Sequence, residues 1–206
     1  MGHQLKIKAV IFDMGGVFLR TEDRQPRLRL AERFGWSLAD LEALVFDSDT
    51  HHQAERGLIS AEDHWRAIGK RINLDAYQTQ EFRRQFFAGD RLDRDFLAWI
   101  SSLRPTFRTA MLSNAWSDLR QVLTKMGGVL ECFDQVFISA ELGMAKPDPR
   151  IFQHVLTSLD VSAPKAIFTD DFQRNIDAAR AMGIHAVRFL SPEQARKEIL
   201  AILDLL

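Results

Sequence analysis

The stretch VIFDMGGVFLR, which runs from Val10 to Arg20, decides how the rest of the chain is interpreted. It begins with apolar residues, reaches a lone carboxylate at Asp13 and then, after one methionine, continues into Gly15 and Gly16. A nearly continuous apolar run is typical of a parallel strand that is covered on both faces. Asp13 is therefore either part of a tight turn or a reactive carboxylate at the end of a buried strand. In the second case the glycines would let the backbone approach a substrate closely.

Further apolar runs predict that this strand belongs to one larger sheet. The expected strands are Ile7–Asp13, Arg108–Ser113, Gln135–Ser139, Ala166–Asp170 and, with a weaker pattern, Ala186–Phe189. Helical patterns lie between them: Ser117 is expected to cap a helix that ends at Gly127, and Asp148 to cap the next one. From Leu103 onward, strands and helices therefore alternate. This order predicts an α/β fold with βαβ units, namely a Rossmann-like, doubly wound parallel sheet.

A block of consecutive helical patterns interrupts this alternation after the first strand. The patterns are QPRLRLAERFG, SLADLEALVFD, SAEDHWRAIGKRI and DAYQTQEFRRQFF. A helix over residues 93–103 is expected to return the chain to the sheet. We therefore predict an α/β core formed by residues 1–18 and 87–206, with a helical cap, residues 19–86, inserted into it.

Composition narrows the class of protein and its partners. The chain has 206 residues, with 27 Lys and Arg against 28 Asp and Glu, so its net charge gives no reason to expect nucleic acid or an anionic membrane as a partner. Cys132 is the single cysteine, which excludes an intrachain disulfide and suits a reducing compartment. The sequence shows no signal-peptide pattern and no run near the ~20 apolar residues of a membrane span. We expect a cytoplasmic monomer or homodimer that acts on a small molecule.

Polar side chains follow four of the expected strands. Because ligands of open α/β sheets bind outside the carboxyl ends of the strands, these side chains are expected to meet at one edge. In chain order they are Asp13, Ser113, Asn114, Lys146, Asp170, Asp171 and Asn175. Any one of them alone would be a weak signal, but together they indicate one site.

These segments resemble the four motifs of the haloacid dehalogenase-like (HAD) hydrolase superfamily. The motifs are FDMGGV, LSNA, GMAKPDPRIF and FTDDFQRNIDAARAMG, and the resemblance covers nearly the whole chain. The stretch AERGLISAEDHW is also similar to the small helical cap of the phosphatase-type branch that includes the N-terminal domain of epoxide hydrolase. The resemblance implies an enzyme of the phosphoric monoester hydrolase type, with Mg²⁺ as cofactor and a phosphorylated small molecule as substrate.

The residue types fit that chemistry. A carboxylate can attack phosphorus and form an acyl phosphate, which divides one difficult hydrolysis into two easier steps, and Asp13 is the expected nucleophile. Asp13 and Asp171 can hold Mg²⁺, which prefers a few carboxylates together with water and phosphate oxygens. The resemblance adds the backbone carbonyl of Gly15 as a third metal ligand. Asp170 and Asn175 are expected to support this site.

The phosphoryl group itself needs positive charge and hydrogen-bond donors. Lys146 offers a fixed cation, Ser113 a hydroxyl group and Asn114 an amide, and the loop at Gly15 and Gly16 offers backbone N–H groups. Simpler interpretations stay open for each residue. Ser113 can belong to a plain strand-ending turn and Lys146 can be a solvated surface residue.

Two supporting residues have open roles as well. Asp170 can contact the metal, or it can brace the loop or Lys146 instead. Asn175 can be an ordinary residue at the start of a helix.

Gly15 departs from the family pattern. Most phosphatases of this superfamily carry an aspartate there, which protonates the leaving alkoxide and then activates water. General acid catalysis of this kind is typically worth about 10²- to 10⁴-fold. Three hypotheses follow: the substrate has a good leaving group, the cap provides an acid from among His51, His52 and Glu55, or the protein turns phosphate esters over poorly.

Two other functions compete with the phosphatase. A haloacid dehalogenase would not need the missing acid, but its family motifs differ from the residues near Gly15 and Asp171, and it works without a metal. A phosphate-binding or regulatory protein on the same scaffold is the other alternative, since a fold alone does not fix a function. The aromatic residues of the cap are expected to pack its helices together, whereas Trp116 is a candidate to border the substrate pocket. The cap aromatics in question are Trp36, Phe46, Trp65, Tyr77, Phe82, Phe86 and Phe87.

Overall fold

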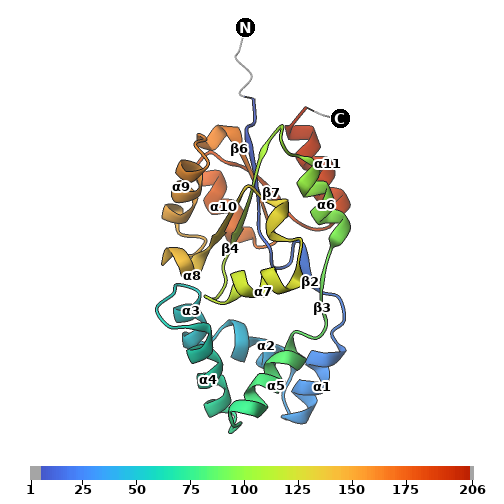
Figure 1. The fold of residues 1–206 in the computed structure, drawn as a ribbon, viewed down its shortest axis with the longest axis vertical. Helices are drawn as coiled ribbons and strands as arrows, with labels where there is room; N and C mark the ends of the chain where they lie inside the picture. The colour runs from blue at the N-terminus through green and yellow to red at the C-terminus, as the bar shows by residue number, and fades with distance from the viewer. Residues whose placement is uncertain (1–5, 205–206) are drawn as a thin grey trace.

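The computed structural model describes residues 6–204 and has a parallel sheet above a group of helices (Figure 1). The five strands of the sheet lie in the order β5-β4-β1-β6-β7 and every neighbouring pair is parallel. They are β1 (Ala9–Phe12), β4 (Arg108–Ser113), β5 (Gln135–Ile138), β6 (Ala166–Asp170) and β7 (His185–Arg188). In register, Val10 of the central strand lies opposite Thr109 and Ile167. The expected Rossmann-like, doubly wound α/β fold is confirmed.

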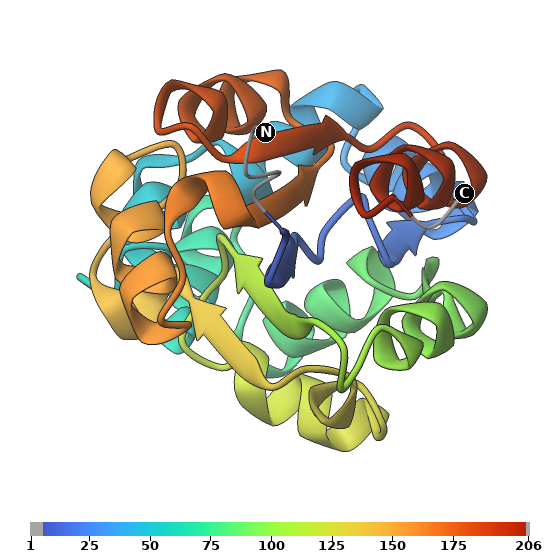
Figure 2. The same ribbon diagram turned by 90° about the horizontal axis from the view of Figure 1, so that it is seen from above.

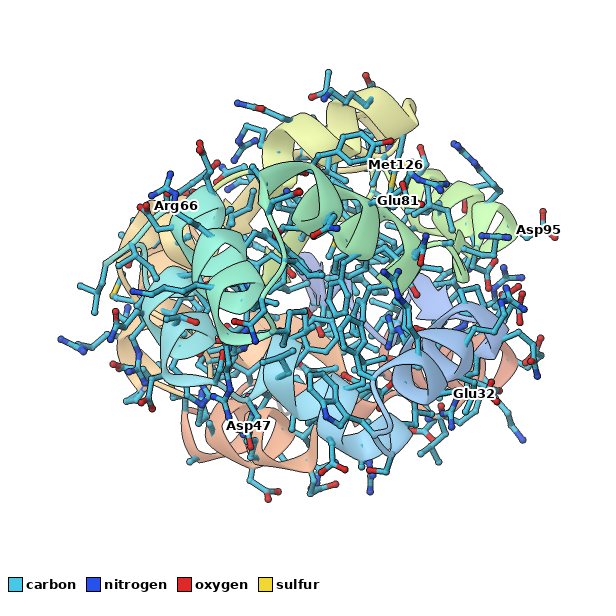
Figure 3. All side chains as sticks on the ribbon, turned by 90° about the horizontal axis from the view of Figure 1, so that it is seen from below. Glu32, Asp47, Arg66, Glu81, Asp95 and Met126 are labelled. Carbon is cyan, nitrogen blue, oxygen red and sulfur yellow. The ribbon has the colours of Figure 1, made fainter. Side chains whose placement is uncertain are left out.

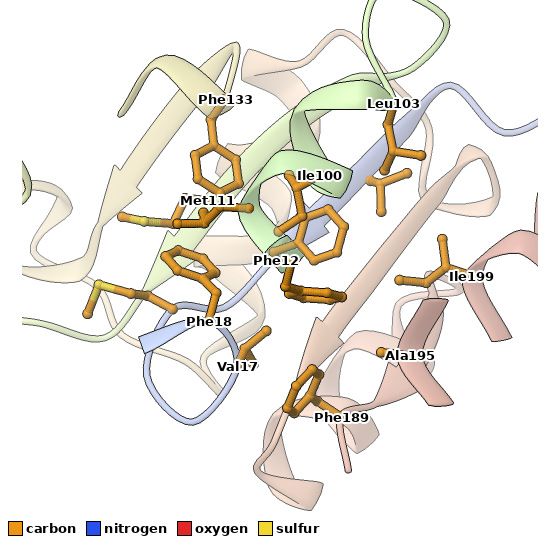
Figure 4. Close-up of a cluster of buried hydrophobic side chains, with 14 of the residues drawn as sticks. Phe12, Val17, Phe18, Ile100, Leu103, Met111, Phe133, Phe189, Ala195 and Ile199 are labelled. Atoms are coloured by element: carbon orange, nitrogen blue, oxygen red, sulfur yellow. The ribbon is translucent and has the colours of Figure 1, made fainter. Parts of the chain in front are cut away.

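Helices cover both faces of this sheet (Figure 2). They are α6 (Arg94–Ser102), α7 (Leu119–Met126), α9 (Pro149–Ser158), α10 (Gln173–Ala181) and α11 (Pro192–Ile202), with short helices α8 (Ser139–Leu142), η1 (Leu130–Cys132) and η2 (Ala163–Lys165). Successive strand residues point to opposite faces, so Phe12 packs with α6, α7 and α11 whereas Ile11 packs with α9 and α10. Figure 4 shows the first of these clusters around Phe12 and Phe18. Because helices bury both faces, the ends of the strands are the part of the sheet that the helices leave uncovered.

The inserted helices form a cap with a hydrophobic core of its own. They are α1 (Gln25–Arg33), α2 (Leu38–Phe46), α3 (Asp49–Ala54), α4 (Ala61–Arg71) and α5 (Ala76–Phe86). Capping boxes begin α2, α4 and α5, and fully or nearly fully buried Trp65, Phe82 and Phe86 lie between the helices. Charged side chains lie on the outer face of the cap, and the labelled Glu32 and Arg66 are among the exposed ones (Figure 3). The helices are therefore amphipathic, as their sequence pattern indicates.

A two-stranded antiparallel ribbon joins the core and the cap, and the sequence analysis missed it. Its strands are β2 (Leu19–Thr21) and β3 (Asp90–Leu92), and Arg20 lies opposite Arg91. Thr21 and Asp90 add a side-chain hydrogen bond of 2.7 Å. The division of the chain at residues 18 and 87 stays a prediction, and it assigns β2 to the cap and β3 to the core although the two strands pair.

The expected cap of α7 is wrong. Asp118, not Ser117, is its N-cap residue, and no side chain there accepts a capping hydrogen bond. The Ser117 hydroxyl instead accepts a hydrogen bond from the backbone N–H of Ala61, which begins α4 of the cap, at 3.2 Å. The Ser117 hydroxyl thus binds a residue that is distant in the sequence rather than the first turn of α7.

No helix within residues 6–204 combines the length and the apolar character that crossing a bilayer requires.

Candidate active site

Asp13 lies at the carboxyl end of the central strand and is buried, with 6% of its surface exposed. Its backbone N–H donates to the carbonyl of Thr169 at 2.8 Å, so β6 continues to hold the chain one residue beyond β1. The central strand can therefore present this carboxylate at a fixed point on the open edge.

Lys146 links two of the aspartates. Its Nζ lies 2.8 Å from Asp13 Oδ1 and 2.6 Å from Asp170 Oδ2, and only 3% of the residue is exposed. The interpretation of Lys146 as a solvated surface residue is therefore wrong. Burial alone would disfavour its charge, but Asp13 and Asp170 outweigh that effect and raise its pKa. Lys146 is thus a buried cation between two carboxylates.

Burial dominates the acid strength of the aspartates. It raises the pKa of Asp13 to about 7, against the opposing attraction of Lys146, and Asp170 adds repulsion. Burial followed by the repulsion of Asp170 raises the pKa of Asp171 to about 6. Three carboxylates face one ammonium group here, so two negative charges are uncompensated when all are ionised. The site therefore favours an additional cation.

Asp170 is saturated by protein partners. Besides Lys146, its carboxylate accepts hydrogen bonds from the backbone N–H of Phe172 at 2.8 Å and from Asn175 Nδ2 at 3.0 and 2.9 Å. These contacts favour the bracing role for Asp170, and they place Asn175 as a donor to it.

Asp171 differs from its neighbour, because its Oδ1 is buried without a hydrogen-bond partner in the described chain. Carboxylate oxygens of Asp13, Asp170 and Asp171 all lie within 4.8 Å of one another. An oxygen-only set of this kind suits Mg²⁺. With Asp170 already engaged, Asp13 and Asp171 are the pair left to hold a divalent cation.

The two glycines of the opening stretch have different surroundings. Gly16 has a φ of +74°, and a Cβ atom placed there would lie 2.2 Å from Asp171 Oδ2. Gly15 has no atom within 4 Å of such a Cβ. Gly16 is thus needed both for its backbone conformation and for the close approach of Asp171, whereas Gly15 borders open space.

Ser113 and Asn114 complete the edge from the neighbouring strand. Ser113 ends β4 and is 2% exposed. The Asn114 side chain makes a two-way contact with the backbone of Lys146: its Nδ2 donates to the carbonyl at 2.8 Å and its Oδ1 accepts from the N–H at 2.8 Å. Asn114 therefore positions the segment that carries Lys146.

The seven residues predicted for this site therefore lie at the last residues of β4 and β6, in the segments that follow β1, β4, β5 and β6, or, for Asn175, in the first turn of α10. The family model for haloacid dehalogenase-like hydrolases matches residues 7–183, a span that contains all of them. The chain belongs to this family. Within the family, it is 33% identical over 181 residues to a sesquiterpene phosphatase of Aspergillus oryzae, an alignment that covers 86% of this chain and 87% of that protein.

A second relative and a solved structure extend the comparison. The chain is 26% identical over 212 residues to the D-ribitol-5-phosphate phosphatase of Bacteroides thetaiotaomicron, covering 96% of this chain and 99% of that protein. It also matches a crystal structure of a HAD family enzyme from the same bacterium, with a TM-score of 0.79, 21% identity and coverage of 94% and 98% of the two chains. The wild-type form of that enzyme in complex with magnesium and inorganic phosphate matches with a TM-score of 0.75 and 22% identity, covering 88% of this chain and 93% of that one.

The polar cap residues contact one another and a residue of the core loop. His51 Nε2 lies 3.3 Å from Glu55 Oε2, His52 Nδ1 lies 3.9 Å from Glu55 Oε1, and the indole N–H of Trp116 donates to His51 Nδ1 at 3.2 Å. His51, His52 and Glu55 are close enough to one another to hold a metal ion. However, an indole can only donate, so His51 Nδ1 must be unprotonated and neutral His51 carries its proton on Nε2. In this arrangement Nε2 carries a proton beside Glu55 and has no lone pair for a metal.

The aromatic side chains fall into two groups. Trp65, Phe82 and Phe86 are buried in the core of the cap, as expected for packing residues, but Tyr77 is 82% exposed and packs no helices together. Trp116 is buried in the same cap core although it belongs to the loop after β4.

Sequence reasoning also missed Ser139. It is fully buried, and its hydroxyl bonds the backbone N–H and carbonyl of Ala115 at 2.9 and 3.2 Å. The available signal was a polar residue at the end of an apolar strand, the same signal that identified the other positions.

Proposed function

We propose that this HAD-family hydrolase is a Mg²⁺-dependent phosphatase that acts on a small phosphorylated metabolite through an aspartyl-phosphate at Asp13. The observation that carries the proposal is the buried contact of Asp13 with Lys146, next to the unpartnered oxygen of Asp171. The phosphatase names of two relatives that the chain covers nearly from end to end support the same reaction class.

In the proposed reaction, Asp13 attacks phosphorus as its carboxylate while the bond to the leaving oxygen breaks. Lys146 opposes the effect of burial on Asp13 and favours its ionised form. Ser113 and the backbone N–H of Gly15 are proposed to bind the phosphoryl oxygens. The N–H of Gly16, which was also expected to do so, donates instead to the carbonyl of Leu19 at 3.0 Å. Water then hydrolyses the acyl phosphate and restores Asp13.

The donor set for the metal is proposed to be the carboxylates of Asp13 and Asp171 and the carbonyl of Gly15. Mg²⁺ held there would offset the negative charge of the carboxylates and the phosphate as they approach each other. The magnesium and phosphate complex of the Bacteroides enzyme supports this assignment, since that enzyme has the same fold.

The leaving group is the finer part of the proposal. Open space around Gly15 means that the position where related enzymes carry an acid is not filled by another side chain within 4 Å of it. His51 contacts both Glu55 and Trp116, so we do not assign the role of the missing acid to these cap residues. We therefore favour a substrate with a good leaving group, such as an acyl phosphate or a sugar 1-phosphate.

A substrate panel assayed with Mg²⁺ and with EDTA tests this function. It should contain acetyl phosphate, glucose 1-phosphate, ribitol 5-phosphate, farnesyl phosphate and p-nitrophenyl phosphate, with 2-chloropropionate as the dehalogenase substrate. Mg²⁺-dependent phosphate release that is fastest on the activated esters supports the proposal. Release of chloride without metal, and no phosphate release, would assign the protein to the dehalogenases. Binding of fluoroberyllate without turnover of any compound would indicate a binding or regulatory protein.

A further inference from the structure

The segment that follows β4 has one end in the active site and the other in the cap. At the active-site end, Asn114 holds the backbone of Lys146 through two hydrogen bonds of 2.8 Å. Lys146 in turn reaches Asp13 at 2.8 Å. The position of Asn114 therefore affects the cation that contacts the proposed nucleophile.

The middle of the segment is held by the core. Ser139 bonds both the N–H and the carbonyl of Ala115. Ala140 follows Ser139 in α8, and its carbonyl contacts Gly57 of the cap. A Cβ atom on Gly57 would lie only 2.2 Å from this carbonyl oxygen. Figure 1 shows α3 of the cap directly below α8, which contains both core residues. The backbone between Asn114 and Trp116 therefore has little conformational freedom.

At the other end, three consecutive core residues bind the cap. Trp116 is only 8% exposed, and its indole donates to His51 of α3. Ser117 accepts from the start of α4, and Asp118 forms an ion pair of 2.5 Å with Arg83 of α5. The ring of Trp116 packs against five cap rings: Phe46, His51, His64, Trp65 and Phe87. The indole is thus part of the cap core although its backbone belongs to the loop after β4.

The hydrogen bonds at this end have a fixed direction. Trp116 donates to His51 Nδ1, and His51 Nε2 lies 3.3 Å from Glu55 Oε2, whose side chain is only 12% exposed. Because an indole N–H can only donate, the lone pair of His51 Nδ1 is the acceptor in this contact. These cap residues therefore serve to orient the indole.

We propose that Trp116 is a positioning residue: by holding its indole, the cap fixes residues 114–118, and through Asn114 it keeps Lys146 in reach of Asp13. The effect on catalysis rests on the proposed phosphatase function. The mechanical link between Trp116 and Lys146 does not, and it can be measured in the absence of any substrate.

Amide hydrogen exchange followed by mass spectrometry measures this link. The Lys146 N–H is the reporter, because it donates to Asn114 Oδ1. In Trp116→Ala we expect exchange at Lys146 to be at least about 5-fold faster, the factor that corresponds to losing one neutral hydrogen bond. In Trp116→Phe, which keeps a ring but removes the N–H donor, we expect a smaller acceleration. If Trp116→Ala does not fold, Trp116→Phe is the deciding variant.

Phe82→Leu is the matched control. Phe82 is as buried as Trp116 and its ring contacts in the described chain are with Phe34, Trp65 and Phe86, not with Trp116. It should loosen the cap and speed exchange in cap peptides, with Lys146 unchanged. Unaltered exchange at Lys146 in the folded Trp116 variants, or an equal acceleration in Phe82→Leu, would overturn the proposal.

Kinetics on an active substrate of the panel give the second measurement. Trp116→Ala should lower kcat by about 10- to 100-fold, the range expected for a displaced catalytic group, with a smaller change in KM and partial recovery in Trp116→Phe. A rise in KM alone would mean that Trp116 contacts the substrate and would contradict the positioning role. If no compound is turned over by the unaltered protein, the proposed function fails, and hydrogen exchange alone decides the link.

Discussion

Replacement of Gly16 by alanine tests the geometry of the metal site most directly. The added Cβ would lie 2.2 Å from Asp171 Oδ2, whereas real Cβ contacts are essentially never shorter than 3.0 Å. The Asp171 carboxylate must therefore move by at least 0.8 Å, the difference between these distances. Its side chain can rotate away, so the clash costs little stability but displaces one of the two proposed carboxylate ligands.

The backbone adds a separate and smaller effect. Gly16 has a φ of +74°, and an alanine in the left-handed region costs about 1–2 kcal/mol. We expect Gly16→Ala to lower the free energy of unfolding by that amount. We also expect it to raise the Mg²⁺ concentration for half-maximal activity by about 10-fold or more, the scale of effect seen when the supports of metal ligands are disturbed.

Gly15→Ala is the control, because a Cβ there meets no atom within 4 Å and its φ is not positive. Urea unfolding should show unchanged or slightly higher stability for this variant, by up to about 1 kcal/mol. Magnesium titrations of phosphatase activity compare the two proteins. If both variants show the Mg²⁺ dependence of the unaltered protein, Asp171 is not the metal ligand that we propose.

Three further outcomes are expected. Asp13→Asn should abolish phosphate release, and steady release by the purified variant would disprove the aspartyl-phosphate. Gly15→Asp should speed hydrolysis of ribitol 5-phosphate by about 10²-fold if the missing acid limits the rate, with little gain on p-nitrophenyl phosphate; equal gains on both would contradict this. His64 is fully buried, and desolvation lowers its pKa to about 4 from the 6.5 expected when unfolded, so its neutral form is the stable one in the fold. Stability should thus fall as pH drops from about 6.5 to 4, by up to roughly 3 kcal/mol, and urea titrations of His64→Asn should lack this part of the pH dependence.

The sheet and its edge were predictable because their signals are local. Each apolar run ends in a polar residue, and the rule for parallel sheets places those ends together. Lys146 and Asp170 were named from that pattern, although their direct contact is visible only in the fold. The choice between metal ligand and brace for Asp170 depends on Asn175 and Phe172, whose donors approach it only once α10 has formed.

Features that depend on distant partners were missed. Strands β2 and β3 have three residues each and pair across about seventy residues of intervening chain, so no local pattern predicts them. The sequence around Ser117 is typical of a helix N-terminus, but its hydroxyl instead accepts a hydrogen bond from the backbone N–H of Ala61 in α4. The position of Trp116 in the cap core was missed for the same reason, since nothing near it in the sequence indicates that its ring lies among the cap helices.

The paired strands β2 and β3 mean that the chain enters and leaves the cap at one place. The cap could therefore be replaced by another inserted domain, because the two ends of the insertion lie side by side on β2 and β3. The register of the five-stranded sheet is set by other strands. Trp116 limits that freedom. A foreign domain grafted onto this ribbon would need a pocket for the indole. A chimera that fits only the strands would leave a large apolar ring uncovered two residues after Asn114, which binds the backbone of Lys146.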